Sequence, residues 1–268
     1  MATERVMAAG RAADAGRQAE DWVSLVAAAQ ARSSCAVVTA EQAWSGRQLL
    51  SHASAAARWL AGWGLPRGRP VPALLEASSE ALALVLAGAA VRRPIAPLGP
   101  RLTVRELAGC IGRLDAPCIV AQAQFAATAW EVARELGREV AVPARWPCPG
   151  EPLPVPAPHD TAVVLHTSGT TGHRRAVHYR HDRLARRVQL SPSLQQLPPG
   201  SVFATAEPFH HIAGLGMIMV ALAAGATTWL SPADHRVAVA REELLKAVGR
   251  AAPGVEVRIW SPDPDDRE

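Results

Sequence analysis

The chain has 268 residues, of which 49% are apolar and 19% charged, and its formal net charge is +4. This apolar share excludes a largely disordered chain, and the length suffices for one large domain or two modest ones. The four cysteines form no C-x-x-C pair and no zinc-like spacing. With no secretory leader at the start, they predict reduced thiols in a cytoplasmic protein.

The first hundred residues alternate between helical and strand-like segments. Apolar residues recur at helical spacing from Trp44 to Gly64, and an Ala/Leu-rich run from Ser78 to Val91 predicts a second helix. Between them, Pro70–Leu75 is a short apolar run typical of a buried strand. Three prolines within residues 94–100 predict an extended connection.

The same alternation continues further along the chain. Thr103 and Glu106 form a capping box, which predicts the start of a third helix. Cys118–Ala121 has the pattern of a short buried strand, and a helix is predicted over Ala126–Leu136. Strands alternating with longer helices predict an α/β fold, with parallel or mixed sheets flanked by helices.

A proline-rich stretch suggests how the chain is divided. Seven prolines between Pro143 and Pro158 predict a stiff, extended linker. The predicted parts are a first α/β subdomain over 1–142 with 1–20 loosely held, a linker over 143–160, a second α/β segment over 161–260, and a disordered tail over 261–268.

One uncharged stretch, Ile212–Leu230, is long enough to cross a membrane. It is interrupted by Gly214, Gly216 and Gly225, and no cluster of basic residues flanks it. These features favour a buried helix followed by a buried strand over a transmembrane helix. No membrane span is therefore predicted.

A loop rich in hydroxyl residues and glycine follows a strand predicted over Thr161–Leu165. The loop runs from Thr167 to Gly172 and is followed by Arg174 and Arg175. Glycines let backbone N–H groups approach phosphate oxygens, hydroxyls donate further hydrogen bonds, and arginines neutralise the charge. The Walker pattern G-x-x-x-x-G-K-[ST] is absent. By composition alone, a polyphosphate-binding loop and a plain polar turn both stay open.

The order of residues in this loop is more specific than its composition. Thr167-Ser168-Gly169-Thr170-Thr171-Gly172 resembles the phosphate loop of the adenylate-forming superfamily, T-S-G-T-T-G-x-P-K-G. That superfamily includes acyl-CoA synthetases, aryl-CoA ligases, luciferases and the adenylation domains of peptide synthetases. Leu74–Leu107 is similar to its upstream block, and Pro208–Leu215 to its P-x-x-H-x-x-G-L segment. The resemblance covers about Trp44 to Leu230 and implies the N-terminal part of an AMP-binding large domain.

The resemblance implies a reaction and the residues that serve it. A carboxylic acid and ATP would form an acyl-adenylate, and a thiol of CoA or of a carrier protein would then accept the acyl group. Thr167 would also help to hold Mg²⁺, and Arg175 takes the place of the loop lysine. The residues expected to bind ATP are Thr167, Ser168, Gly169, Thr170, Thr171, Gly172 and Arg175.

Histidines after the loop also have counterparts in the superfamily. His211 matches a histidine near the acyl pocket and the access path of the thiol, which implies a catalytic role. An ordinary buried polar residue at a strand end is the alternative. His181 matches a histidine common after the loop, but a surface residue at a helix start is favoured there, with Asp182 expected to cap that helix.

The sequence also departs from the superfamily. Arg174, Arg175 and Ala176 replace the proline, lysine and glycine of the motif, and the chain has no Gly-Asp pair for ribose. The only lysine, Lys246, lies in no matching context, and the chain has about half the usual length. We therefore expect either a truncated ligase, whose missing half comes from a continuation of the chain or from a partner polypeptide, or an inactive remnant or interaction protein that keeps the fold and weak nucleotide binding.

Six arginines between Arg174 and Arg187 leave a third alternative open, which is nucleic-acid binding. Arginine is almost the only basic residue of this chain, so a solvated helix face is the favoured interpretation of the cluster.

Overall fold

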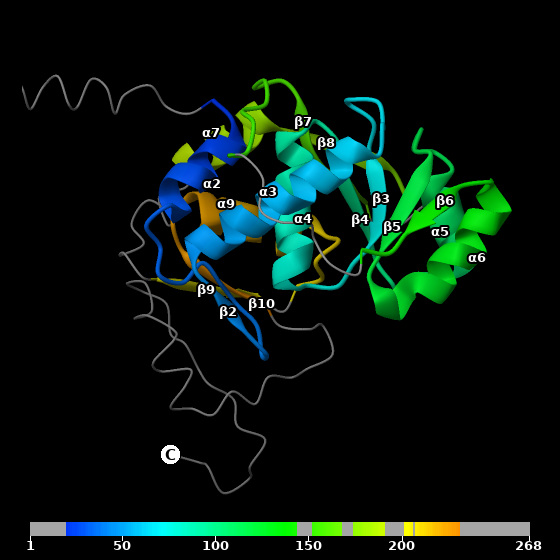
Figure 1. Ribbon diagram of the computed structural model, residues 1–268, viewed down its shortest axis with the longest axis horizontal. Coiled ribbons are helices and arrows are strands. Elements are labelled where there is room, and N and C mark those ends of the chain that lie inside the picture. Colours follow the sequence, from blue (N-terminus) through cyan, green and yellow to red (C-terminus); the bar gives the residue numbers. More distant parts are fainter. Residues whose placement is uncertain (1–19, 144–151, 168–173, 191–200, 206, 231–268) are drawn as a thin grey trace, which may run out of the picture.

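The computed structural model describes residues 20–143, 152–167, 174–190, 201–205 and 207–230 (Figure 1). The predicted tail and residues 1–19 of the predicted loose segment lie outside these ranges, as does Lys246. Within the described ranges the strands form two sheets, one of six strands and one of four. Helices flank both sheets, which confirms the predicted α/β fold (Figure 1).

The larger sheet has the strand order β6-β5-β3-β4-β7-β8, and every pair is parallel except β7 with β8. Its central strands are buried along their whole length, as expected for a parallel sheet covered on both faces. The bounds are β3 (Val71–Leu74), β4 (Ile95–Leu98), β5 (Cys118–Ala121), β6 (Glu139–Ala141), β7 (Thr161–His166) and β8 (Ala176–Arg180).

Helices cover the two faces of this sheet because the connections change direction after β4. The connection from β3 to β4 moves one way along the sheet, and those leading to β5 and β6 move the other way. Right-handed crossovers then place α4 (Ser79–Ala90) on one face and α5 (Val104–Ile111) and α6 (Ala126–Leu136) on the other. A short 3-10 turn, η1 (Ala123–Phe125), precedes α6.

The smaller sheet has the order β2-β1-β10-β9, in which only β1 and β2 are antiparallel. Several helices lie between the two sheets, and one hydrophobic core joins them to β1, β10, β4 and β7. The bounds are β1 (Val37–Val38), β2 (Ala43–Trp44), β9 (Val202–Thr205), β10 (Thr227–Leu230), α2 (Trp22–Gln30), α3 (Gly46–Gly62), α7 (His181–Gln189) and α9 (Met217–Ala223).

Polar side chains of α2 form hydrogen bonds with main-chain carbonyls of α9, which lie 197 and 192 residues later in the chain. The indole Nε1 of Trp22 donates to the carbonyl of Met219 at 2.7 Å, and Gln30 Nε2 donates to the carbonyl of Leu222 at 2.9 Å. Both sheets combine strands from before and after residues 143–160, where a subdomain boundary is predicted. Sheet membership therefore does not follow the predicted division, because sequence-distant strands complete each sheet.

Several predicted elements are confirmed close to their expected bounds. Thr103 and Glu106 form the capping box that begins α5, and Ser45 with Gln48 forms another at α3. The expected connection over residues 94–100 is wrong, since it contains β4, a central strand with Pro97 inside it. The pairing of β4 with β7 is confined to Ile95 and Val163. Pro97 lies beyond this pair, so its lack of an N–H costs no hydrogen bond between β4 and β7.

The stretch Ile212–Leu230 is a buried helical segment followed by a strand, as predicted. A π-turn, η2 (Ile212–Gly216), leads into α9, and β10 follows. Among the described residues, none of the helices has both the length and the apolar character needed to cross a membrane.

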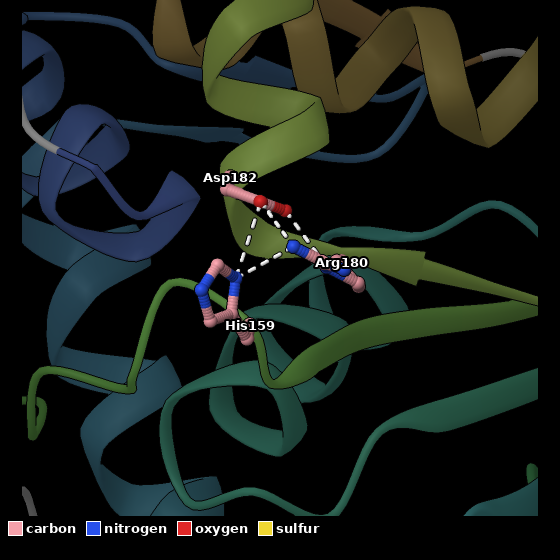
Figure 2. A network of polar contacts seen from close by, with 3 residues as sticks. All are labelled: His159, Arg180 and Asp182. Atoms are coloured by element: carbon pink, nitrogen blue, oxygen red, sulfur yellow. Dashed lines mark hydrogen bonds and ion pairs between the residues drawn. The ribbon is translucent and has the colours of Figure 1, made fainter.

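A polar network fastens the end of the proline-rich stretch to the start of α7 (Figure 2). Arg180 Nε donates to Oδ1 of Asp182 at 3.0 Å, and Arg180 Nη2 lies 2.6 Å from Nδ1 of His159. The expectation that Asp182 caps the helix is wrong: Arg180 is the N-cap residue, and Asp182 lies in the first turn. Its hydrogen bond with Arg180 lowers the pKa of the Asp182 carboxyl.

Candidate functional site

The two ends of the predicted phosphate loop are held together by hydrogen bonds. The N–H of Thr167 donates to the carbonyl of Arg175 at 3.0 Å, and the N–H of Arg175 donates to Oγ1 of Thr167 at 3.1 Å. This pair, called the neck here, continues the antiparallel pairing of β7 with β8, whose last partners are His166 and Ala176. Ser168 to Gly172 lie outside the described residues.

The neck leaves groups free for a polyphosphate. Thr167 and Arg175 are both exposed, and the Thr167 hydroxyl keeps its own proton and one lone pair after accepting from Arg175. That lone pair suits Mg²⁺, which prefers oxygen ligands, and the guanidinium suits phosphate oxygens. The residues present at the neck therefore fit Mg·ATP.

A buried histidine lies directly before the neck. His166 ends β7 with only 8% of its surface exposed. Burial lowers its pKa to about 4, and the positive charges of Arg174 and Arg113 add to the effect. The imidazole is therefore neutral near pH 7. Sequence reasoning did not select His166, because no local pattern separates it from the rest of the strand.

The last loop residue, Arg174, contacts α5 and the turn after it. Nη1 of Arg113 donates to the carbonyl of Arg174 at 3.0 Å, and Nη2 of Arg174 lies 4.0 Å from Oε1 of Glu106. These contacts join the neck to a part of the chain about sixty residues earlier.

A pocket of about 200 Å³ opens at the same edge of the six-stranded sheet as the neck. Three segments line it, and they follow the carboxyl ends of β3, β4 and β9. Since β4 and β7 are parallel neighbours, their carboxyl ends lie together, where open α/β sheets usually bind ligands. The mostly apolar lining consists of Leu75, Glu76, Ala77, Gly99, Pro100, Arg101, Leu102, Glu207, Pro208, Phe209 and His210.

His210, rather than the predicted His211, lines this pocket. Its ring packs against Gly99 so closely that a Cβ there would lie 2.7 Å from Nε2 of His210. Burial, assisted by the positive charges of His211 and Arg174, lowers the His210 pKa to about 4.

His211 lies beside the pocket wall, and its main-chain groups form the hydrogen bonds of a turn. Its ring centroid is 4.4 Å from that of His210. Its N–H donates to the carbonyl of Pro208 at 3.0 Å, and its carbonyl accepts from the N–H of Leu215 at 2.9 Å. The predicted catalytic role of His211 stays a prediction. Sequence reasoning missed His210, although two adjacent histidines were a signal that either could face a ligand.

His181 lies at the first position of α7, but it is buried and not on the surface as favoured from sequence. Burial lowers its pKa. It lies beside α2 and α4, next to the end of β8 where Arg180 pairs with Thr161. The neck lies at the opposite end of this strand pair, so the structure does not bring His181 together with Thr167 or Arg175.

Comparisons with known proteins agree with this geometry. The model of the family described as AMP-binding enzyme matches residues 25–255. ATP-bound MatB from Rhodopseudomonas palustris superposes with a TM-score of 0.68 at 25% identity, covering 77% of this chain and 44% of that one. The amide bond synthetase McbA from Marinactinospora thermotolerans gives 0.69 at 24% identity, covering 81% and 45%.

A curated relative is the nonribosomal peptide synthetase ftmPS of Neosartorya fischeri, which is 26% identical over 56% of this chain and 7% of that protein. The chain thus spans less than half the length of the relatives named here. The family model covers most of the chain, and the solved structures share its arrangement of sheets and helices. The chain therefore belongs to the AMP-binding enzyme family.

Proposed function

We propose that this chain carries the ATP-binding loop and part of the acid-binding pocket of an adenylate-forming ligase. The observation that carries the proposal is the closed neck at Thr167 and Arg175, set beside an apolar pocket at one sheet edge. This arrangement would bring a nucleotide phosphate and a carboxylic acid together. The match to the family model and the likeness to an ATP-bound relative support it.

In the proposed reaction, a carboxylate oxygen attacks the α-phosphorus of ATP. A new C–O–P linkage forms, the bond to the bridging oxygen breaks, and pyrophosphate leaves with the electron pair. Backbone and hydroxyl donors of Thr167–Gly172 would bind the β- and γ-phosphates, and Arg175 would balance their charge. Thr167 would help to hold Mg²⁺, which neutralises charge on the phosphates.

The pocket would take the acyl group of the acid. Its walls are mainly apolar, and a neutral His210 gives it a group that can donate or accept a hydrogen bond. Transfer of the acyl group to a thiol of CoA or a carrier protein would be the second half-reaction. Contacts to adenine and ribose would come from a continuation of the chain or from a partner polypeptide.

Calorimetric titration with Mg·ATP tests the first part of the proposal. The wild-type chain should bind, and a variant with Gly172→Val and Arg175→Ala should not, because the loop would lose both close backbone approach and charge. ATP–pyrophosphate exchange with a panel of carboxylic acids, alone and with candidate partner polypeptides, then tests acid activation. Absence of binding by a folded wild-type chain would favour the alternative of an inactive member that keeps only the fold.

A further inference from the structure

The exit of the phosphate loop is held by contacts that lie outside the loop motif. Arg174 stands where the superfamily motif has proline, a residue that fixes φ and limits backbone freedom. An arginine at this position has no such restriction, so the loop exit needs another source of order. The structure offers one in α5 and the turn that follows it.

The stronger of the two contacts is a charge-assisted hydrogen bond. Nη1 of Arg113 donates to the carbonyl of Arg174 at 3.0 Å, directly before the neck residue Arg175. Hydrogen bonds from a guanidinium are stronger than those between neutral groups. This bond holds the peptide between Arg174 and Arg175, whose N–H donates to Thr167 Oγ1.

The second contact is electrostatic and acts on the Arg174 side chain. Its Nη2 lies 4.0 Å from Oε1 of Glu106, whose other oxygen, Oε2, accepts from the N–H of Thr103 in the capping box. The capping box therefore keeps the Glu106 carboxylate in place before any contact with the loop. Since both partners are partly exposed, solvent weakens this attraction, and it adds to the Arg113 bond without replacing it.

We propose that Arg113, assisted by Glu106, is a positioning residue of the phosphate loop, and that it supplies the order which the motif's proline gives elsewhere. The inference rests on the proposed function for its effect on nucleotide binding. Holding the exit in place lowers the entropy lost when Thr167 and Arg175 bind phosphate oxygens. Arg113 acts through Arg174 and need not touch the nucleotide.

The affinity test uses the full 268-residue chain and Mg·ATP. Arg113→Ala should weaken binding roughly fivefold, as expected for the loss of one typical hydrogen bond at an exposed site. Arg113→Lys should recover part of the affinity because it keeps one charged donor. Arg105→Ala is the matched control: it removes an equal charge from an exposed site on α5, and its affinity should equal that of the wild type. Equal losses for Arg113→Ala and Arg105→Ala would overturn the proposal.

A second form of this test uses a chain in which position 174 carries the proline of the superfamily motif. In an Arg174→Pro chain the loop exit is restricted by proline itself, so Arg113→Ala should weaken Mg·ATP binding less than twofold, against about fivefold in the parent chain. An undiminished fivefold loss would show that Arg113 acts on nucleotide binding by another route.

Hydrogen exchange without nucleotide separates this inference from the proposed function. Arg113→Ala should speed exchange of the Thr167 and Arg175 amides, which donate the two neck hydrogen bonds, while Arg105→Ala leaves both unchanged. Faster exchange in a chain that never binds Mg·ATP would retain the Arg113 contact and reject the nucleotide function. Unchanged exchange in Arg113→Ala would reject the positioning role.

Discussion

The neck follows β7 of the six-stranded sheet and the pocket wall follows β9 of the four-stranded sheet, and different forces hold them. The neck, Thr167 and Arg175, is closed by hydrogen bonds in which the main chain takes part. The pocket wall, Glu207–His210, is packed against glycines so closely that a single added methyl group would collide with it. Hydrogen bonding of the main chain tolerates most side-chain changes, whereas close packing tolerates few.

The largest expected effect on stability is that of Gly214→Ala, because Gly214 packs against the pocket wall. A Cβ at this position would lie 2.3 Å from the carbonyl oxygen of Pro208, a backbone atom that has little room to move. We expect the free energy of unfolding to fall by about 3 kcal/mol, measured by urea denaturation.

Gly109→Ala is the control for that change. Nothing lies within 4 Å of a Cβ built at this helical position, so alanine should raise the free energy of unfolding by up to about 1 kcal/mol. If both substitutions proved neutral, close packing at the wall would be disproved.

Acid should lower the stability of the folded chain through two histidines, His166 beside the neck and His210 in the pocket wall. The pKa values of His166 and His210 are about 4 in the folded chain and near 6.5 when exposed. The unfolded chain therefore binds more protons between these values, and stability is lost as the pH falls from 6.5 towards 4. Each histidine should contribute up to about 1.4 kcal/mol per pH unit.

Unfolding measured by urea at several pH values checks this prediction. His166→Gln and His210→Gln should each make the pH dependence between 6.5 and 4 shallower. A slope that neither substitution changes would show that both imidazoles are protonated as easily in the folded chain as in the unfolded one.

Thr167→Val tests the neck with a smaller expected effect. Valine keeps the shape of threonine but removes the acceptor of the Arg175 N–H. Mg·ATP binding should weaken about tenfold, since one hydrogen bond is lost and a donor is left without its partner. Calorimetry with Thr167→Ser, which keeps the hydroxyl, is the comparison, and equal affinities of the two variants would contradict the role of Oγ1.

Gly99→Ala should have the smallest effect on stability, and it should weaken acid binding without changing ATP binding. The colliding atoms belong to the His210 ring, which can turn away, so the free energy of unfolding should change by less than about 1 kcal/mol. In ATP–pyrophosphate exchange the KM for the acid should rise a few-fold while that for ATP stays constant. An equal change in both KM values would argue that the pocket does not hold the acid.

Much of the fold could be predicted because its signals are local. The helix over Ala126–Leu136 and the strand over Cys118–Ala121 have the predicted bounds, because the first shows helical apolar spacing and the second is a short, continuous apolar run of strand length. Pro97 misled the prediction, because a proline usually excludes a central strand. Its place in β4 depends on where the pairing with β7 ends, which no local pattern records.

The same distinction between local signals and long-range contacts applies to the candidate site. The sequence by itself determined the family, because six consecutive residues, Thr167–Gly172, match the order of glycines and hydroxyls in its motif, while phosphate binding by this loop stays a prediction. Only the tertiary structure decided that His210 faces the pocket, that Arg113 reaches Arg174, and that each sheet combines early and late strands. The physical reason is that these contacts join residues far apart in the chain, and their geometry is set by the packing of the whole core.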